Sequence, residues 1–337
     1  MVVNIGAPPS RSVYWLAVPL LAAALLLPAV FNGFPLLHPD SGTYLRVALG
    51  AGWPIDRSGF YGLMLAPLVA KAGGTAALWL WTALQVTITA AVLLETLRRV
   101  APGCKAARLM MLGAAMVLFT ALPWHAGQLM PDAMTGLLVL AAWLALSRSP
   151  GAPGAPILWL AVCLFALTHV THLLILVAIG VVMLGLALAG RVPREEVATR
   201  ALALFVACLV IAGAQMGANA LTLKAPTVSP AGPIFLFARL NEDGHIAPWL
   251  DRHCGKDAPA DLCAIRHQLP QDSQELLWGP TSDTYFPVPG PGEHDRFSRW
   301  MKAFDAANKG AVAQRAPGAG NLAKGRLGPV RYLWDAG

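Results

Sequence analysis

Residues 34–44 (FPLLHPDSGTY) place an imidazole, a carboxylate and two hydroxyl groups within six positions, starting at His38. A carboxylate that accepts a hydrogen bond from a substrate hydroxyl can act as a general base, so Asp40 is a candidate catalytic residue. Pro39 disfavours helical backbone at the residue before it, so a helix is predicted to begin just after Pro39, with Asp40 or Ser41 as its N-cap. Asp40 is therefore either a catalytic base or a helix cap.

A second candidate carboxylate is Asp132, which follows Pro131 and precedes an uncharged run of only 15 residues, 133–147. As a helix this run is about 22 Å long, which is shorter than the thickness of a bilayer. Asp132 is thus predicted at or slightly below the membrane surface. We expect it to be a second catalytic carboxylate that orients the site or holds a divalent cation. The alternative is again a helix N-cap.

Further polar residues in loops predicted on the same side of the membrane are candidates for substrate binding. They are His38, Tyr44, Arg57, His125, His169 and His172. A planar guanidinium suits phosphate oxygens, so Arg57 is a candidate phosphate contact, with a surface ion pair to Asp56 as the alternative. His169 and His172 are three residues apart and share one helical face if the helix continues across them. Taken alone, each histidine is more often a structural polar residue at the end of a span than a ligand-binding residue.

The composition indicates a polytopic membrane protein. Of 337 residues, 56% are hydrophobic and only 13% are charged, whereas a soluble domain is about one quarter charged. Residues 1–224 contain 13 Lys or Arg against 6 Asp or Glu, and residues 225–337 contain 12 of each. The whole net charge of +7 therefore lies in the membrane half. It is explained by topology and needs no nucleic-acid partner.

Uncharged stretches between charged residues locate about seven transmembrane helices, because a charge in the bilayer centre is costly. The first, residues 13–31, is interpreted as an uncleaved anchor, since no small-x-small cleavage site follows it. The 42 uncharged residues between Arg148 and Arg191 are enough for two crossings. The predicted spans are residues 13–31, 75–94, 109–130, 133–147, 153–169, 172–190 and 201–223.

The distribution of Lys and Arg in the short loops predicts the orientation. Nine of these residues lie on the side of the N-terminus and four on the other, so the N-terminus is predicted to be cytoplasmic. Asp40, Asp132 and everything after Lys224 then face outward from the inner (plasma) membrane, into the periplasm if the cell is Gram-negative. The long first outer loop, residues 32–74, contains two short apolar pieces that we expect to lie along the interface. A re-entrant piece is the alternative for residues 59–70.

After residue 224 the composition becomes more polar. Residues 225–306 are predicted to form a small, mostly irregular outer domain with one short strand-like run at 234–238, and residues 307–337 a flexible tail. Cys254 and Cys263 are the only cysteine pair on the oxidising side, so a disulfide is expected. A metal site that also uses His253 and His267 is the alternative.

The first 150 residues resemble the GT-C superfamily of polytopic membrane glycosyltransferases. The resemblance covers residues 11–150 and rests on the cytoplasmic start, the long first outer loop with its short interfacial helices, and His38-Pro39-Asp40-Ser41 with Tyr44, together with Asp132. It implies that the loop carboxylate acts on the acceptor and that the donor is a sugar on a polyprenyl phosphate or pyrophosphate. The chain departs from the family in having fewer spans and no paired Asp-Asp or Asp-Glu in the first loop.

The expected function is therefore glycosyl transfer from a polyprenyl-phosphate-type donor at the outer membrane face, with membrane lipid as a further partner. A divalent cation is the one cofactor that the acidic residues suggest, and nothing in the sequence specifies an oligomeric state. The alternative is a non-enzymatic membrane protein, either a lipid or solute transporter or a scaffold with an outer domain. Transporters tend to carry ionisable residues near the bilayer midplane and internal repeats, and neither is evident in this sequence.

Overall fold

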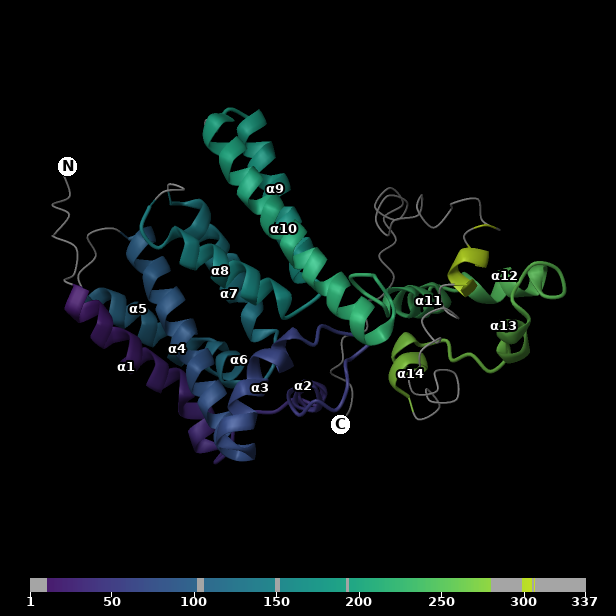
Figure 1. The fold of residues 1–337 in the computed structure, drawn as a ribbon, viewed down its shortest axis with the longest axis horizontal. Coiled ribbons are helices and arrows are strands. Elements are labelled where there is room, and N and C mark those ends of the chain that lie inside the picture. Colours follow the sequence, from purple (N-terminus) through teal and green to yellow (C-terminus); the bar gives the residue numbers. More distant parts are fainter. Residues whose placement is uncertain are drawn as a thin grey trace. The chain divides into compact units, whose positions relative to one another are not determined.

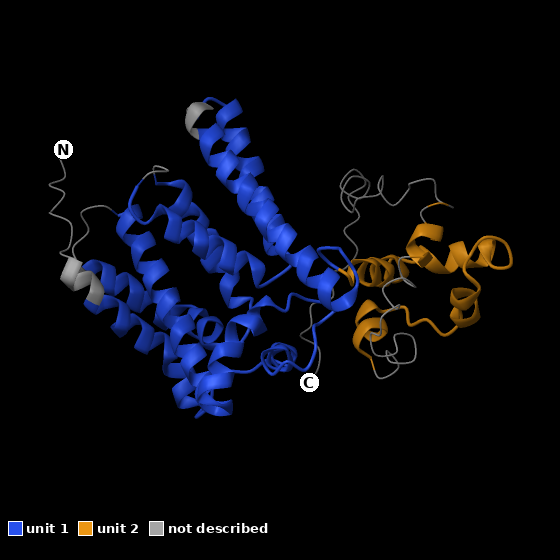
Figure 2. Ribbon diagram, in the orientation of Figure 1, with its two compact units in different colours: residues 1–229 blue, residues 230–337 orange. Residues whose placement is uncertain are grey.

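The structure is a computed structural model that describes residues 11–101, 106–148, 152–191, 194–279, 299–304 and 306. Across these residues the regular secondary structure is entirely helical, and the one extended pairing is an isolated bridge between Leu36 and Gln128 (Figure 1). The all-α prediction is confirmed for this part of the chain. Two compact units, residues 1–229 and 230–337, divide the molecule (Figure 2).

Unit 1 contains ten helices among its described residues. They are α1 (Arg11–Phe31), α2 (Ser41–Ala48), α3 (Phe60–Ala72), α4 (Gly74–Val100), α5 (Ala106–Phe119), α6 (Leu122–Gly127), α7 (Ala133–Leu146), α8 (Ala155–Leu167), α9 (His172–Leu188) and α10 (Arg194–Leu223). The short helices α2 and α3 correspond to the two apolar pieces of the first loop. The predicted span 109–130 is not continuous, because α5 ends at Phe119. Pro123 in the first turn of α6 has no N–H to donate to the carbonyl of Phe119, so the α5 helix is not continued through it.

Two helices in the described part of the chain are long and apolar enough to cross a membrane: α4 and the segment Val197–Leu223 of α10. In α10 only 22% of the most apolar 18-residue stretch is buried inside the protein, whereas in α4 the buried share of the corresponding stretch is 56%. The α10 side chains Leu202, Phe205 and Leu209 are all more than half exposed. A core helix of a soluble protein would be buried, so this exposed apolar surface favours membrane association. The seven-span topology stays a prediction.

Most of the helices of unit 1 share one hydrophobic core. Tyr44 of α2 and Tyr61 and Leu65 of α3 pack with Leu138 of α7 and Leu176 of α9, and all five side chains are at most 2% exposed. A second cluster joins α1 to α4, through residues such as Leu25 and Ala90. The core therefore fixes α2, α3 and α7 with respect to one another, and these are the helices that follow the candidate site residues.

Unit 2 contains helices α11 (Gly232–Glu242), α12 (Ile246–His253), α13 (Ala260–Ile265) and α14 (Ser273–Trp278). The prediction of a mostly irregular segment is wrong for these residues, and the strand-like run 234–238 lies inside α11. Its buried residues Phe237 and Asn241 are four apart, which places them on one helical face. Apolar β-branched and aromatic residues favour a strand only where the packing provides a sheet.

The predicted disulfide between Cys254 and Cys263 is present, with Cα atoms 5.7 Å apart. It links the end of α12 to α13, beside a core that includes Trp249 and Trp300. The alternative metal site is not formed, because the disulfide uses both thiols; His253 Nδ1 instead lies 2.7 Å from Asp257 Oδ1. This hydrogen bond lowers the pKa of Asp257. The predicted flexible tail, residues 307–337, lies outside the described residues.

Candidate functional site

Helix α2 begins at Ser41, directly after the Pro39-Asp40 pair, as the sequence predicts. Asp40 occupies the N-cap position, but its carboxylate accepts no hydrogen bond from the first turn. The hydroxyl of Ser41 instead accepts the backbone N–H of His38 at 2.9 Å and donates to the carbonyl of Leu129 at 2.8 Å. Asp40 therefore has the predicted N-cap position without a capping hydrogen bond, and its carboxylate is available for other contacts.

Two loops that are far apart in the sequence are held side by side. The N–H of Leu129 donates to the carbonyl of Leu36 at 2.8 Å, next to the isolated bridge between Leu36 and Gln128. The hydroxyl of Ser41 reinforces this pairing through Leu129. Asp132 follows the second loop at the N-cap position of α7, where its exposed side chain also makes no capping bond. The pairing places the segment before α2, which carries Asp40, beside the segment before α7, which carries Asp132.

Arg57 binds two carboxylates at once. Its Nη1 lies 2.7 Å from Asp40 Oδ2, and its Nη2 and Nε lie 2.6 and 2.8 Å from Asp56 Oδ2. The Arg57 side chain is 14% exposed, whereas that of Asp40 is 40% exposed and open to an incoming molecule. Burial alone would lower the pKa of Arg57, but the hydrogen bonds and charges of Asp56 and Asp40 raise it above its usual value. Arg57 is therefore a permanent cation, and the predicted ion pair with Asp56 is confirmed.

Tyr44 is buried beneath this cluster. Burial raises the pKa of its phenol well above the usual value; the charge of Arg57 opposes this shift, and the charges of Asp132 and Asp40 add to it. The phenol is therefore neutral across the physiological range. The charges of Asp40, Arg57 and Asp132 all affect the pKa of this one buried hydroxyl. The three residues therefore belong to one electrostatic neighbourhood.

The histidines separate into exposed and buried groups. His169 and His172 do not share a helix, because α8 ends at Leu167 and α9 begins at His172, although their rings are 5.4 Å apart. His172 is fully buried, with Nδ1 at 2.8 Å from the carbonyl of Phe165 and Nε2 at 2.9 Å from Thr135 Oγ1. It joins α7, α8 and α9 and cannot touch a substrate in this conformation. His169 is partly exposed and interacts electrostatically with Asp132 and Arg57.

The two remaining histidines are exposed. His38 Nδ1 accepts the backbone N–H of Asp40 at 3.3 Å, so this imidazole lies beside the candidate base. His125 lies on the surface of α6, and within the described residues no hydrogen bond or ion pair links it to Asp40 or Asp132. His38 and His169 are thus the predicted histidines that the fold brings to the cluster.

A buried polar network beneath the cluster was missed by the sequence analysis. The indole N–H of Trp81 donates to the hydroxyl of Tyr61, which donates to Gln85 Oε1, both at 2.8 Å. Gln85 Nε2 donates to the carbonyls of Ala126 and Gln128, also at 2.8 Å. The one available signal was the i, i+4 spacing of Trp81 and Gln85 in α4. This network fixes the loop that leads to Asp132.

Replacing Gln85 by leucine is expected to destabilise unit 1 by about 1–3 kcal/mol. The buried Tyr61 hydroxyl would lose its acceptor, and the carbonyls of Ala126 and Gln128 would lose their donor. Thermal unfolding of the full chain in detergent measures this. Thr87→Val is the control, because its exposed hydroxyl bonds only to the carbonyl one turn earlier. Equal melting temperatures for the two variants would contradict the positioning role.

The loop that carries Arg57 is attached to α10. Gln215 Nε2 donates to Ser58 Oγ and to the carbonyl of Leu167, both at 2.9 Å. Asn219 Oδ1 accepts the indole N–H of Trp53 at 2.9 Å. Gln215 and Asn219 thus link α10 to the loop that precedes α3. They hold residues 53–58 and restrict the position of Arg57.

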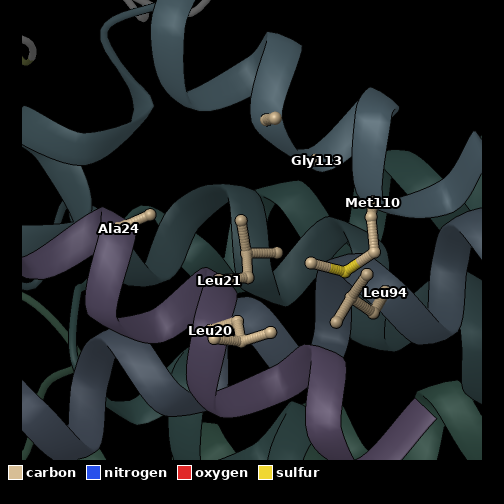
Figure 3. Close-up of a pocket in the computed structure, with 7 residues that line it drawn as sticks. Leu20, Leu21, Ala24, Leu94, Met110 and Gly113 are labelled. Carbon is tan, nitrogen blue, oxygen red and sulfur yellow. The ribbon is translucent and has the colours of Figure 1, made fainter. Parts of the chain in front are cut away.

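An apolar hollow of about 70 Å³ lies between α1, α4 and α5 (Figure 3). Its lining contains neither Asp40 nor Asp132, so it does not provide the shared outer cavity predicted for them, and that cavity stays a prediction. In the part of the chain that the structure describes, no group of three or more His, Cys, Asp or Glu side chains is arranged to hold a metal ion. The divalent cation suggested for Asp132 thus has no ligand set there.

Comparison with known proteins finds no family model, no curated protein and no solved structure that matches the chain.

Proposed function

We propose that the chain is a membrane glycosyltransferase that transfers a sugar from a polyprenyl-phosphate donor at the outer membrane face. The observation that carries the proposal is the cluster of Asp40, Arg57 and Tyr44 beside Asp132. It combines a half-exposed carboxylate, a permanent cation and a second carboxylate within one electrostatic neighbourhood. Base, phosphate-binding cation and orienting carboxylate are the three groups that such a transfer needs.

In this proposal Asp40 takes the proton of the acceptor hydroxyl. The acceptor oxygen forms a bond to the anomeric carbon of the sugar, and the bond from that carbon to the phosphate oxygen breaks, which releases polyprenyl phosphate. Arg57 binds Asp40 through one carboxylate oxygen, and a guanidinium carries five N–H groups. Its contacts with the two aspartates use three of them and a hydrogen bond to the Tyr44 hydroxyl uses a fourth, so one remains for a phosphate oxygen. Asp132 and His169 orient the sugar or its acceptor.

The membrane topology is part of the proposal. We infer seven spans with the N-terminus in the cytoplasm and residues 225–337 outside. The supporting observations are the apolar surface that α10 exposes and the nine-to-four distribution of Lys and Arg in the loops. The disulfide adds support, because disulfides persist in oxidising compartments outside the cytoplasm.

An alkaline phosphatase fused after Ser229 is expected to be active, because this enzyme functions only where its own disulfides can form. The same reporter fused after Arg148, on the predicted cytoplasmic side, is expected to be inactive. Colony assays of the two fusions, with immunoblots to normalise expression, measure this. Activity only in the second fusion would invert the topology and place Asp40 on the cytoplasmic side.

The transfer is tested with purified protein in vesicles that contain a polyprenyl phosphate carrying a radiolabelled sugar. Formation of free polyprenyl phosphate is the readout, because it reports cleavage whatever the acceptor is. A transporter, the alternative function, would move the donor across the bilayer and leave it intact. An intact donor in the presence of a broad mixture of acceptors contradicts the proposal.

A further inference from the structure

One buried amide joins three parts of unit 1. Gln215 of α10 is 2% exposed, and its Nε2 donates to Ser58 Oγ and to the carbonyl of Leu167. Ser58 is equally buried, and its hydroxyl donates to the same Leu167 carbonyl at 2.6 Å. Each of these three groups therefore contacts the other two, and together they form the Gln215 network.

The place of Leu167 in the fold explains why its carbonyl accepts two side-chain hydrogen bonds. Leu167 is the last residue of α8, and the last carbonyls of a helix have no N–H partner within the helix. A buried carbonyl of this kind needs a donor from elsewhere in the chain. Gln215 and Ser58 supply that donor, so the end of α8 is fixed to α10 and to the loop before α3.

The network lies between two residues of the candidate site. Ser58 directly follows Arg57, and Leu167 lies two residues before His169. The His169 ring is also held, because its Nδ1 accepts the backbone N–H of Thr171 at 3.3 Å. In the neutral imidazole this contact leaves the proton on Nε2, which can donate it to a ligand. A cation and a hydrogen-bond donor are thus attached to one buried network from two different loops.

We propose that Gln215 and Ser58 are positioning residues that hold Arg57 and His169 at a fixed separation, and that this separation sets how tightly the donor binds. The inference rests on the proposed function, in which Arg57 binds the donor phosphate, and it places His169 against the sugar. The ligand class is a sugar phosphate. An anionic oxygen meets the guanidinium, and a sugar oxygen accepts the Nε2–H of the imidazole.

The proposed base is held by other contacts. Hydrogen bonds of Ser41 and Leu129 fix the segment that carries Asp40. Loosening the Gln215 network therefore weakens contacts that the donor makes in the ground state and in the transition state alike. Such a loss raises KM and leaves kcat nearly unchanged.

Gln215→Met keeps the length of the side chain and removes both N–H donors. Ser58 can still donate to the Leu167 carbonyl, so both partners keep a hydrogen bond and the variant is expected to fold. The KM for the donor is expected to rise about tenfold, with kcat within about twofold of the wild type. Rates of polyprenyl phosphate release at varied donor concentration measure this. Thr222→Val on the same helix, where the exposed hydroxyl bonds to the carbonyl one turn earlier, is the matched control and should keep the wild-type KM.

Ser58→Ala tests whether the two residues act through one network. Gln215 still donates to the Leu167 carbonyl in this variant, so it also serves if Gln215→Met does not fold. The double variant is expected to raise KM by much less than the product of the two single effects, because both changes break the same connection. Multiplicative effects contradict the shared network. Lower melting temperatures with an unchanged KM indicate a purely stabilising role and overturn the proposal.

Native mass spectrometry with the intact donor and no acceptor tests binding without turnover. The wild type is expected to bind the donor about tenfold more tightly than Gln215→Met, and His169→Ala should weaken binding as well. If the donor binds with these differences but is never cleaved, the proposed function is wrong and the positioning inference stands. If the donor is cleaved and the folded variants bind it as the wild type does, only the positioning inference is overturned. No binding by the wild type overturns both.

Discussion

Replacing Asp40 by asparagine is expected to lower the rate of polyprenyl phosphate release by roughly 10²–10⁴-fold, which is the contribution of general acid–base catalysis. Asparagine preserves the size of the side chain and an oxygen that can accept a hydrogen bond from Arg57, but it cannot take a proton from the acceptor. The variant should still insert and fold, because the Asp40 side chain is 40% exposed and makes no capping hydrogen bond. Initial rates at saturating donor measure the effect.

Asp56→Asn is the matched control for this experiment. It removes the other carboxylate that binds Arg57, so it weakens the same ion-pair cluster and leaves the proposed base in place. We expect Asp56→Asn to retain most of the activity. If Asp40→Asn and Asp56→Asn lower the melting temperature alike and neither changes the rate, the cluster is structural. That result would falsify the catalytic assignment and leave Asp132 as the next residue to replace.

Removal of the disulfide by the double substitution Cys254→Ala and Cys263→Ala is expected to destabilise unit 2 by roughly 2–3 kcal/mol. In the chain-entropy model, opening a loop this short returns that much conformational freedom to the unfolded chain. The bond links the end of α12 to α13, so local opening of these helices should increase. Limited proteolysis of the full chain in detergent, followed by mass spectrometry of residues 246–265, measures it.

The control for the disulfide is the pair Cys163→Ala and Cys208→Ala, which removes the half-buried free thiols of α8 and α10. This variant should keep the proteolysis pattern of the wild type. Reductant should convert the wild-type pattern into that of the double variant and leave the double variant unchanged. Two free thiols in freshly isolated protein, or insensitivity of the wild type to reductant, would contradict the prediction.

The sequence by itself determined the features that depend on near neighbours in the chain. Pro39 restricts the residue before it, so the start of α2 follows from local sterics. The disulfide could also be predicted, because Cys254 and Cys263 are close in the sequence and in one compartment. The run 234–238 shows the limit of such reasoning. Its residue types suit a strand, but with no neighbouring strand in the described part of unit 2 the backbone satisfies its hydrogen bonds as helix α11.

The tertiary structure alone decided what the candidate site residues bind. The choice between cap and ion pair at Asp40 depends on where Arg57 lies, because the guanidinium carries a full positive charge and the N–H groups of the first turn carry only partial charges. The position of Asp132 relative to the segment that carries Asp40 depends on the hydrogen bond between Leu129 and Leu36, which joins segments far apart in the chain. Likewise the packing of α7, α8 and α9 buried His172 and left His169 partly exposed. Contacts of this kind depend on how whole helices pack, and the residue types within one segment do not contain that information.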